Sequence, residues 1–171
     1  TMKIPAAAAS LIMFISTFWD AINDPIMGVI ADKTKTKVGR YRPYFLISPL
    51  LLTFFSAMLW VNPDFSTRGK IIYILIMYIG YGMTVTMYTM PQTAILPACV
   101  KSNDRRNQIV SLGAGFSALA FTVGSSFSEQ IKGFFEKTLH MSNGYIAMVI
   151  YCGILACISF WGLFATSDEK Y

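Results

Sequence analysis

Charged side chains are scarce in this chain of 171 residues: they make up 13% of it, against about a quarter of a typical soluble domain. Hydrophobic residues reach 54% and aromatic residues 15%. This charge deficit excludes an ordinary soluble domain and indicates an integral membrane protein. The net charge of +5 does not indicate a nucleic-acid partner, because the basic residues are confined to short breaks between apolar segments.

Cysteine and histidine are also few, with three residues and one residue respectively. We interpret Cys99, Cys152 and Cys157 as buried helical thiols that act as small hydrophobes, and not as a disulfide framework. The sequence contains no nucleophile–base pair, no metal-type Cys/His spacing and no phosphate-binding glycine loop. It therefore supports neither an enzyme nor a cofactor.

Five apolar stretches are long enough to cross a hydrocarbon core of roughly 30 Å at about 20 residues each. Lipid offers the backbone no hydrogen-bond partner, so each crossing segment should be an α-helix. The second stretch is apolar almost all round, so we expect it to face lipid, whereas polar and small residues suggest that the first, third and fourth line an interior. The expected fold is an all-α polytopic membrane helix bundle in the lipid bilayer, with spans at residues 4–31, 44–61, 71–100, 107–131 and 145–165.

Lysine and arginine gather in two of the four connections between these stretches. Residues 33–42 contain five of them and residues 101–106 contain three, whereas each other connection holds two. Positive charge favours the cytoplasmic side, which places the C-terminus in the cytoplasm and the N-terminus outside a multi-pass cell-membrane protein. Because the first three residues carry no signal for exporting a free N-terminus, we expect further transmembrane helices to be missing from this piece.

Two carboxylates and an amide lie inside the first apolar stretch. Asp20, Asn23 and Asp24 are three and four residues apart, so a helix places them on one face. An ionisable group at membrane depth costs about 2.5–3.5 kcal/mol on insertion scales, so two together indicate a function. Hard monovalent cations prefer oxygen ligands, and we expect these side chains to bind Na⁺ or Li⁺, or to carry a proton.

Two other interpretations remain open for the carboxylates. They could pair with lysine or arginine on a neighbouring helix, although this chain has no basic residue at the middle of a span. They could also lie at a helix end in water, but apolar residues precede and follow them. Pro25, which comes next, removes a backbone hydrogen bond and frees a carbonyl near the site.

The third stretch carries hydroxyls at helical spacing, at Thr86, Thr89 and Thr93. Thr86 could complete the cation shell. The alternative is that each threonine only bonds back to the preceding turn. We expect a second group of residues to line the binding space of a small polar solute, namely Trp19, Thr89, Gln92 and Thr93.

Two segments of the chain carry a family resemblance: residues 19–28 (WDAINDPIMG) and 39–44 (GRYRPY). They resemble the second helix and the following loop of the glycoside–pentoside–hexuronide:cation symporter family, of which melibiose permease is the best-known member. The likeness covers the whole chain, as helices two to six of a twelve-helix major facilitator protein. It implies part of an N-terminal half in a secondary transporter with alternating access, coupling uptake of a sugar or glycoside to Na⁺, Li⁺ or H⁺. It also implies a cation site at Asp20, Asn23, Asp24 and Thr86.

The residues expected to bind the solute differ from those of melibiose permease. Thr89 replaces an acidic residue, Thr93 replaces an aromatic residue, and residues 110–116 lack the sugar-binding arginine. Arginine and carboxylates organise sugar hydroxyls in such sites, so the galactoside specificity is not implied here.

The segment from residue 28 to residue 42 resembles the cytoplasmic gating motif of the superfamily. Asp32 could pair with Arg40, Arg42 or Arg105 and hold an inner gate shut during alternating access. The alternative is that these charges only set the topology.

Two other functions remain open beside sugar symport. One is a truncated or degenerate paralogue that transports nothing, and the other is a transporter of a non-sugar solute, such as a lipid, on the same scaffold. An apolar lateral opening in place of a polar central cavity would favour the lipid.

Overall fold

The computed structural model describes residues 5–37, 39–139 and 144–166. These ranges contain no β-strand and form five α-helices: α1 (Ala6–Lys33), α2 (Arg42–Trp60), α3 (Thr67–Cys99), α4 (Asn103–Leu139) and α5 (Gly144–Thr166). By length and composition, all five are able to cross a membrane. The expected all-α membrane helix bundle is confirmed.

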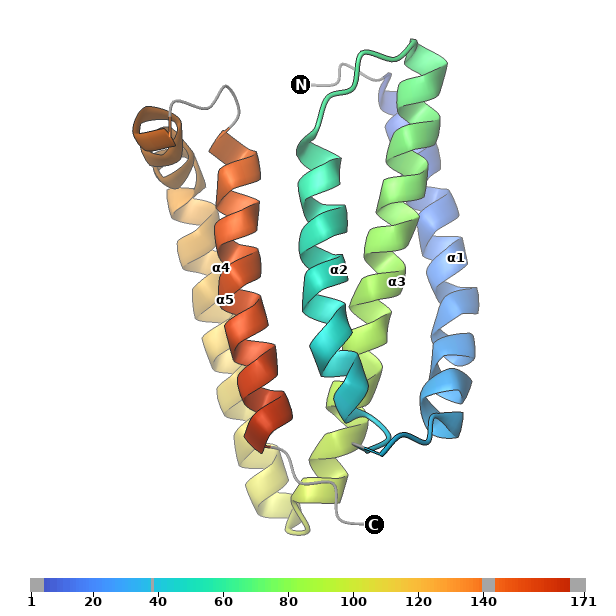
Figure 1. Ribbon diagram of the computed structural model, residues 1–171, viewed down its shortest axis with the longest axis vertical. Helices are drawn as coiled ribbons and strands as arrows, with labels where there is room; N and C mark the ends of the chain where they lie inside the picture. Colours follow the sequence, from blue (N-terminus) through green and yellow to red (C-terminus); the bar gives the residue numbers. More distant parts are fainter. Residues whose placement is uncertain (1–4, 38, 140–143, 167–171) are drawn as a thin grey trace.

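The helices run up and down along one common direction, and both basic connections lie at the same end of the bundle (Figure 1). The connection from α1 to α2 and that from α3 to α4 are at the bottom of the view, whereas the connection from α2 to α3 is at the top. One end of the bundle therefore carries most of the positive charge, as the pattern of basic residues requires.

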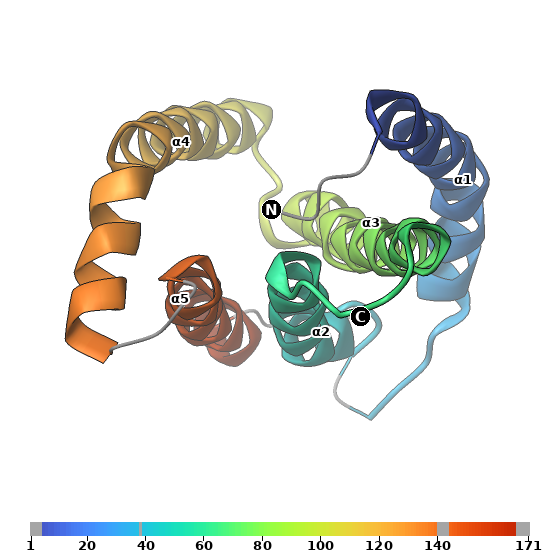
Figure 2. The same cartoon turned by 90° about the horizontal axis from the view of Figure 1, so that it is seen from above.

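The helices do not pack in sequence order. Contacts join α1 to α3, α3 to α2, α2 to α5 and α5 to α4. Seen from above, they form an open arc with α1 and α4 at its two ends, and α4 bends near its C-terminal end (Figure 2). The first helix thus packs against the third, which brings two polar stripes together.

The second helix lies at the centre of this arc and packs against α3 and α5, whereas Leu46, Leu50 and Phe54 remain exposed, so the expectation that it faces lipid stays a prediction for that side of the helix. Phe45 is fully buried, and its ring stacks on Phe160 of α5 at a centroid distance of 6.2 Å. Gly153 of α5 lies so close to α2 that a Cβ there would be 2.3 Å from Thr53. An apolar surface suits a neighbouring helix as well as it suits lipid, so hydrophobicity alone could not distinguish them.

Two of the three cysteines lie on α5 and are free thiols. Cys157 is partly buried, but Cys152 is exposed, against the expectation of burial. Cysteine behaves as a small hydrophobe, so an exposed position on this apolar helix is compatible with its character.

Candidate cation site

The polar residues of α1 meet α3 at two levels, and the two helices run in the same direction (Figure 1). Thr86 Oγ1 donates a hydrogen bond of 2.9 Å to Asp24 Oδ1. One turn earlier, Asp20 Oδ1 fills the space beside Gly82, where a Cβ would lie 2.7 Å from that oxygen. Both pairs are 62 residues apart in the sequence, so the helices keep one register over this turn.

A cavity of about 320 Å³ opens between the two helices at these levels. Its oxygen atoms come from two carboxylates and from hydroxyl groups, which are the ligands that a hard cation prefers. Both helices that line it are apolar enough to cross a membrane. The residues that line it are Asp20, Asp24, Tyr78, Tyr81, Gly82, Val85, Thr86, Thr89 and Met90.

Within residues 5–37, 39–139 and 144–166, the ion pairs are Arg40–Asp32 and Lys132–Glu129. Neither Asp20 nor Asp24 therefore has a lysine or arginine partner in the described part of the chain. Two neighbouring carboxylates without a fixed positive charge repel each other when both are ionised. A bound cation or a proton would relieve that repulsion.

Asn23, the third member of the expected stripe, is only 3% exposed, and its Nδ2 has no hydrogen-bond partner. An amide nitrogen can only donate, so this atom cannot bind a cation. The carbonyl oxygen of the same side chain is the atom that could serve as a ligand. The structure places Asn23 in the interface with α3, beside the carboxylates but outside the cavity lining.

The residues expected to line a solute space are only partly brought together. Thr89 lines the cavity, and its hydroxyl also donates to Val85 O at 3.0 Å. Gln92 and Thr93 are exposed outside this cavity, and the Thr93 hydroxyl bonds back to Met90 O at 2.9 Å. Trp19 is 37% exposed and does not line the cavity either.

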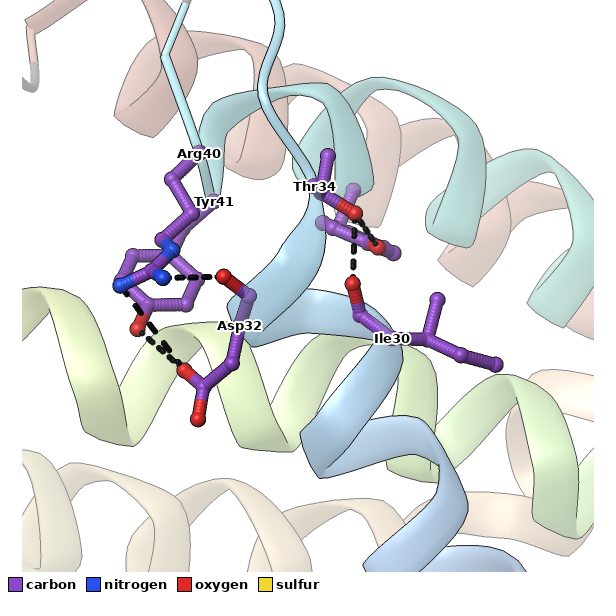
Figure 3. Close-up of polar contacts among 6 residues, drawn as sticks. Ile30, Asp32, Thr34, Arg40 and Tyr41 are labelled. Atoms are coloured by element: carbon purple, nitrogen blue, oxygen red, sulfur yellow. Dashed lines mark hydrogen bonds and ion pairs between the residues drawn. The ribbon is translucent and has the colours of Figure 1, made fainter.

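Of the residues expected at an inner gate, the structure brings Asp32 and Arg40 together, at the end of α1 (Figure 3). Arg40 Nη1 lies 4.0 Å from Asp32 Oδ1, Arg40 Nη2 donates to Asp32 O, and Tyr41 Oη donates to Asp32 Oδ1 at 3.1 Å. Burial, this hydrogen bond and the charge of Asp32 raise the pKa of Tyr41, so its hydroxyl remains a donor at neutral pH. Next to this cluster, the Thr34 and Tyr44 hydroxyls share a hydrogen bond of 2.6 Å.

The other two arginines expected at this gate lie elsewhere. Arg42 donates from Nε to Phe164 O at 3.2 Å, and its guanidinium lies 4.7 Å from the Phe164 ring, so it joins α2 to the end of α5. Arg105 is exposed and lines a separate cavity of about 510 Å³ together with Lys101 and Ser102. In the described residues, the ion pair of Asp32 is with Arg40.

Sequence reasoning missed several residues of this cavity. Tyr78, Gly82, Thr86 and Met90 follow one another at intervals of four, which places them on one face of α3. Extending the stripe backwards from Thr86 would have found Tyr78 and Gly82. The close approach of a carboxylate to Gly82 could not have been found in this way, because it depends on the register between two helices.

Comparison with known proteins gives the family. The family model described as "MFS/sugar transport protein" matches residues 1–171. An uncharacterized symporter, YnaJ, of Bacillus subtilis is 29% identical over 161 residues, which are 90% of this chain and 35% of that protein. The isoprimeverose transporter of Lactiplantibacillus pentosus is 24% identical over 168 residues, covering 98% of this chain and 35% of that protein.

A relative of a different kind is also similar. The sodium-dependent lysophosphatidylcholine symporter 1 of Gallus gallus is 29% identical over 126 residues, which are 73% of this chain and 24% of that protein. The chain spans about a third, or less, of the length of these relatives. Because the family model covers the chain from end to end, the chain belongs to the MFS/sugar transport protein family of multi-pass membrane transporters.

Proposed function

We propose that this chain carries the cation site of a symporter that couples a cation gradient to solute uptake by alternating access. Asp20 and Asp24 supply charged oxygens, Thr86 supplies a hydroxyl and Asn23 supplies a carbonyl. The observation that carries the proposal is the pair of carboxylates at one cavity without a basic partner in the described residues. Placing an ionisable carboxylic acid inside a membrane costs free energy, and binding a mobile cation is a function that explains why two such acids are present.

The coupling ion is Na⁺, Li⁺ or H⁺. Oxygen ligands alone suit Na⁺ and Li⁺, and a carboxylate that shares its cavity with a second carboxylate can also take up a proton. A sodium-dependent symporter among the relatives supports Na⁺ as the first ion to test.

The solute in this proposal is a sugar or glycoside. Hydroxyls of Tyr78, Tyr81 and Thr89 border the cavity, and they can donate to and accept from sugar hydroxyls. The isoprimeverose transporter among the relatives supports this class. Trp19, Gln92 and Thr93 belong to the solute path only if it extends beyond the cavity described above.

A lysophospholipid is the second candidate solute. A cavity of about 700 Å³ on α4 and α5 is lined mainly by apolar side chains, including Phe127, Phe134 and Tyr151. An acyl chain fits such a lining. The lysophosphatidylcholine symporter among the relatives supports the same class.

The proposed orientation places both basic connections and the end of α5 in the cytoplasm, so α1 begins outside. The two basic connections share one end of the bundle (Figure 1), and positive charge favours the cytoplasmic side. Asp32, Arg40 and Tyr41 then form an inner latch, with Arg42 and Arg105 outside it.

The test uses the full-length transporter in liposomes with a panel of glycosides and a lysophosphatidylcholine, with and without a sodium or proton gradient. Asp20→Asn and Asp24→Asn should abolish cation-stimulated uptake and leave membrane insertion intact. The matched control is Asp64→Asn, because Asp64 is exposed in the connection between α2 and α3. Coupled accumulation at the wild-type level in both cavity variants would refute the cation site, and uptake of no solute by the wild type would favour a non-transporting paralogue.

A further inference from the structure

One hydroxyl on α1 behaves differently from the others. Ser10 Oγ donates to Ala6 O at 3.1 Å and Thr17 Oγ1 donates to Met13 O at 3.0 Å, which is the usual arrangement for a hydroxyl within a helix. Ser16 is only 3% exposed, and its Oγ has no hydrogen-bond partner. Leaving a buried hydroxyl without a partner costs about 1–3 kcal/mol, so this atom requires an explanation.

The register between α1 and α3 shows where this hydroxyl lies. Asp24 meets Thr86 and Asp20 meets Gly82, both at a separation of 62 residues. The same separation places Ser16 at the level of Tyr78, which lines the cavity. Ser16 is also four residues before Asp20, so the two side chains share one face of α1. The buried hydroxyl therefore lies one turn from Asp20 toward the start of α1, on the side away from the basic connections, and outside the set of residues that line the cavity.

We propose that Ser16 Oγ is a further ligand for the coupling cation, one turn from Asp20, and that the ion is a hard monovalent metal cation. A hydroxyl oxygen has lone pairs for Na⁺ or Li⁺ and is a poor base, so it assists metal cations and not protons. In the orientation proposed above, it lies on the extracellular side of the carboxylates and receives the ion before they do. This inference rests on the proposed function of the Asp20 and Asp24 pair.

The experiment measures binding of Na⁺ alone, and of Li⁺ alone, to the purified full-length transporter by titration calorimetry. Ser16→Ala removes the oxygen, and Ser16→Cys replaces it with a soft sulfur of similar size, which is a poor ligand for Na⁺. We expect both variants to raise the Kd for Na⁺ about tenfold. Thr17→Ala is the matched control, because the Thr17 hydroxyl is exposed and bonds within its own helix. It should bind Na⁺ as the wild type does.

Asp24→Asn separates this inference from the proposed function. Loss of Na⁺ binding in Asp24→Asn together with wild-type affinity in Ser16→Ala would overturn the role of Ser16 and leave the carboxylate site standing. Wild-type affinity in Asp24→Asn would overturn both.

Two further results would also overturn the role of Ser16. Recovery of affinity in Ser16→Cys but not in Ser16→Ala would show that the side chain only fills space. Absence of Na⁺ and Li⁺ binding to the wild type would leave only proton coupling. Thermal unfolding of each variant is measured as well. An unfolding temperature equal to that of the wild type confirms that the comparison is between folded proteins.

Discussion

The Asp20 carboxylate occupies the space that a side chain at residue 82 would need: a Cβ on Gly82 would lie 2.7 Å from Asp20 Oδ1. A glycine on α3 thus sets the position of a carboxylate on α1. The cation site consequently depends on a residue that has no polar group of its own.

Gly82→Ala should weaken cation binding about tenfold, because the added methyl group displaces the Asp20 carboxylate from the cavity. Sodium titration of the full-length protein measures this effect. Gly115→Ala is the control, since nothing lies within 4 Å of a Cβ at that position of α4. Equal affinities in the two variants would show that Asp20 adapts without loss.

Thr86→Ala should also raise the Kd for Na⁺ about tenfold, which corresponds to about 1.4 kcal/mol. The change removes the hydroxyl that bonds to Asp24 and that is expected to reach the ion. Thr86→Ser keeps this hydroxyl and should bind nearly as the wild type does. Thr122→Ala removes an exposed hydroxyl that bonds back to Ala118 O on α4, so it should leave the affinity unchanged.

Arg40→Gln should open the inner end of the protein with little effect on stability. The Arg40–Asp32 pair is largely exposed, and such pairs contribute about 0–1 kcal/mol. A cysteine introduced at Thr89, in a background without native cysteines, should react several-fold faster with a cytoplasmic maleimide when Arg40 is replaced. Arg68→Gln, at the opposite end of the bundle, is the control, and equal reaction rates in both would contradict the latch.

Gly153→Ala should destabilise the bundle by about 1–3 kcal/mol, because overpacking at a helix interface forces the helices apart. The added Cβ would lie 2.3 Å from both Oγ1 and Cγ2 of Thr53. Removing these atoms in the double variant Gly153→Ala/Thr53→Ala should recover part of the loss in thermal unfolding, because the Cβ of residue 53 still lies 2.8 Å from the added Cβ. Gly162→Ala, which has open space around it on the same helix, should be neutral or slightly stabilising.

Much of this architecture was predictable from the chain itself. Apolar length predicts the five helices, and spacings of three and four predict that Asp20 and Asp24 share a face. The meeting of Asp24 with Thr86 was also expected, both from the polar stripe of the third stretch and from the family resemblance.

What could not be predicted depends on how helices sit against one another. Periodicity shows which residues share a face within one helix, but not which level of a neighbouring helix they meet. For that reason the contact of Asp20 with Gly82, the central position of α2 and the binding of Arg42 to Phe164 were all missed. The orphaned hydroxyl of Ser16 was missed as well, because its sequence context is no different from that of Thr17.

The spacing of the polar residues on α1 has a consequence for motion. Ser16, Asp20 and Asp24 recur every four residues, and four residues of helix span about 6 Å. If α1 slid by that distance along α3 toward the basic end, Asp20 would arrive opposite Thr86 and Ser16 opposite Gly82. At each level of α3, one oxygen of α1 would then replace another. An ion could therefore move with the sliding helix without leaving an ionised carboxylate next to apolar side chains only.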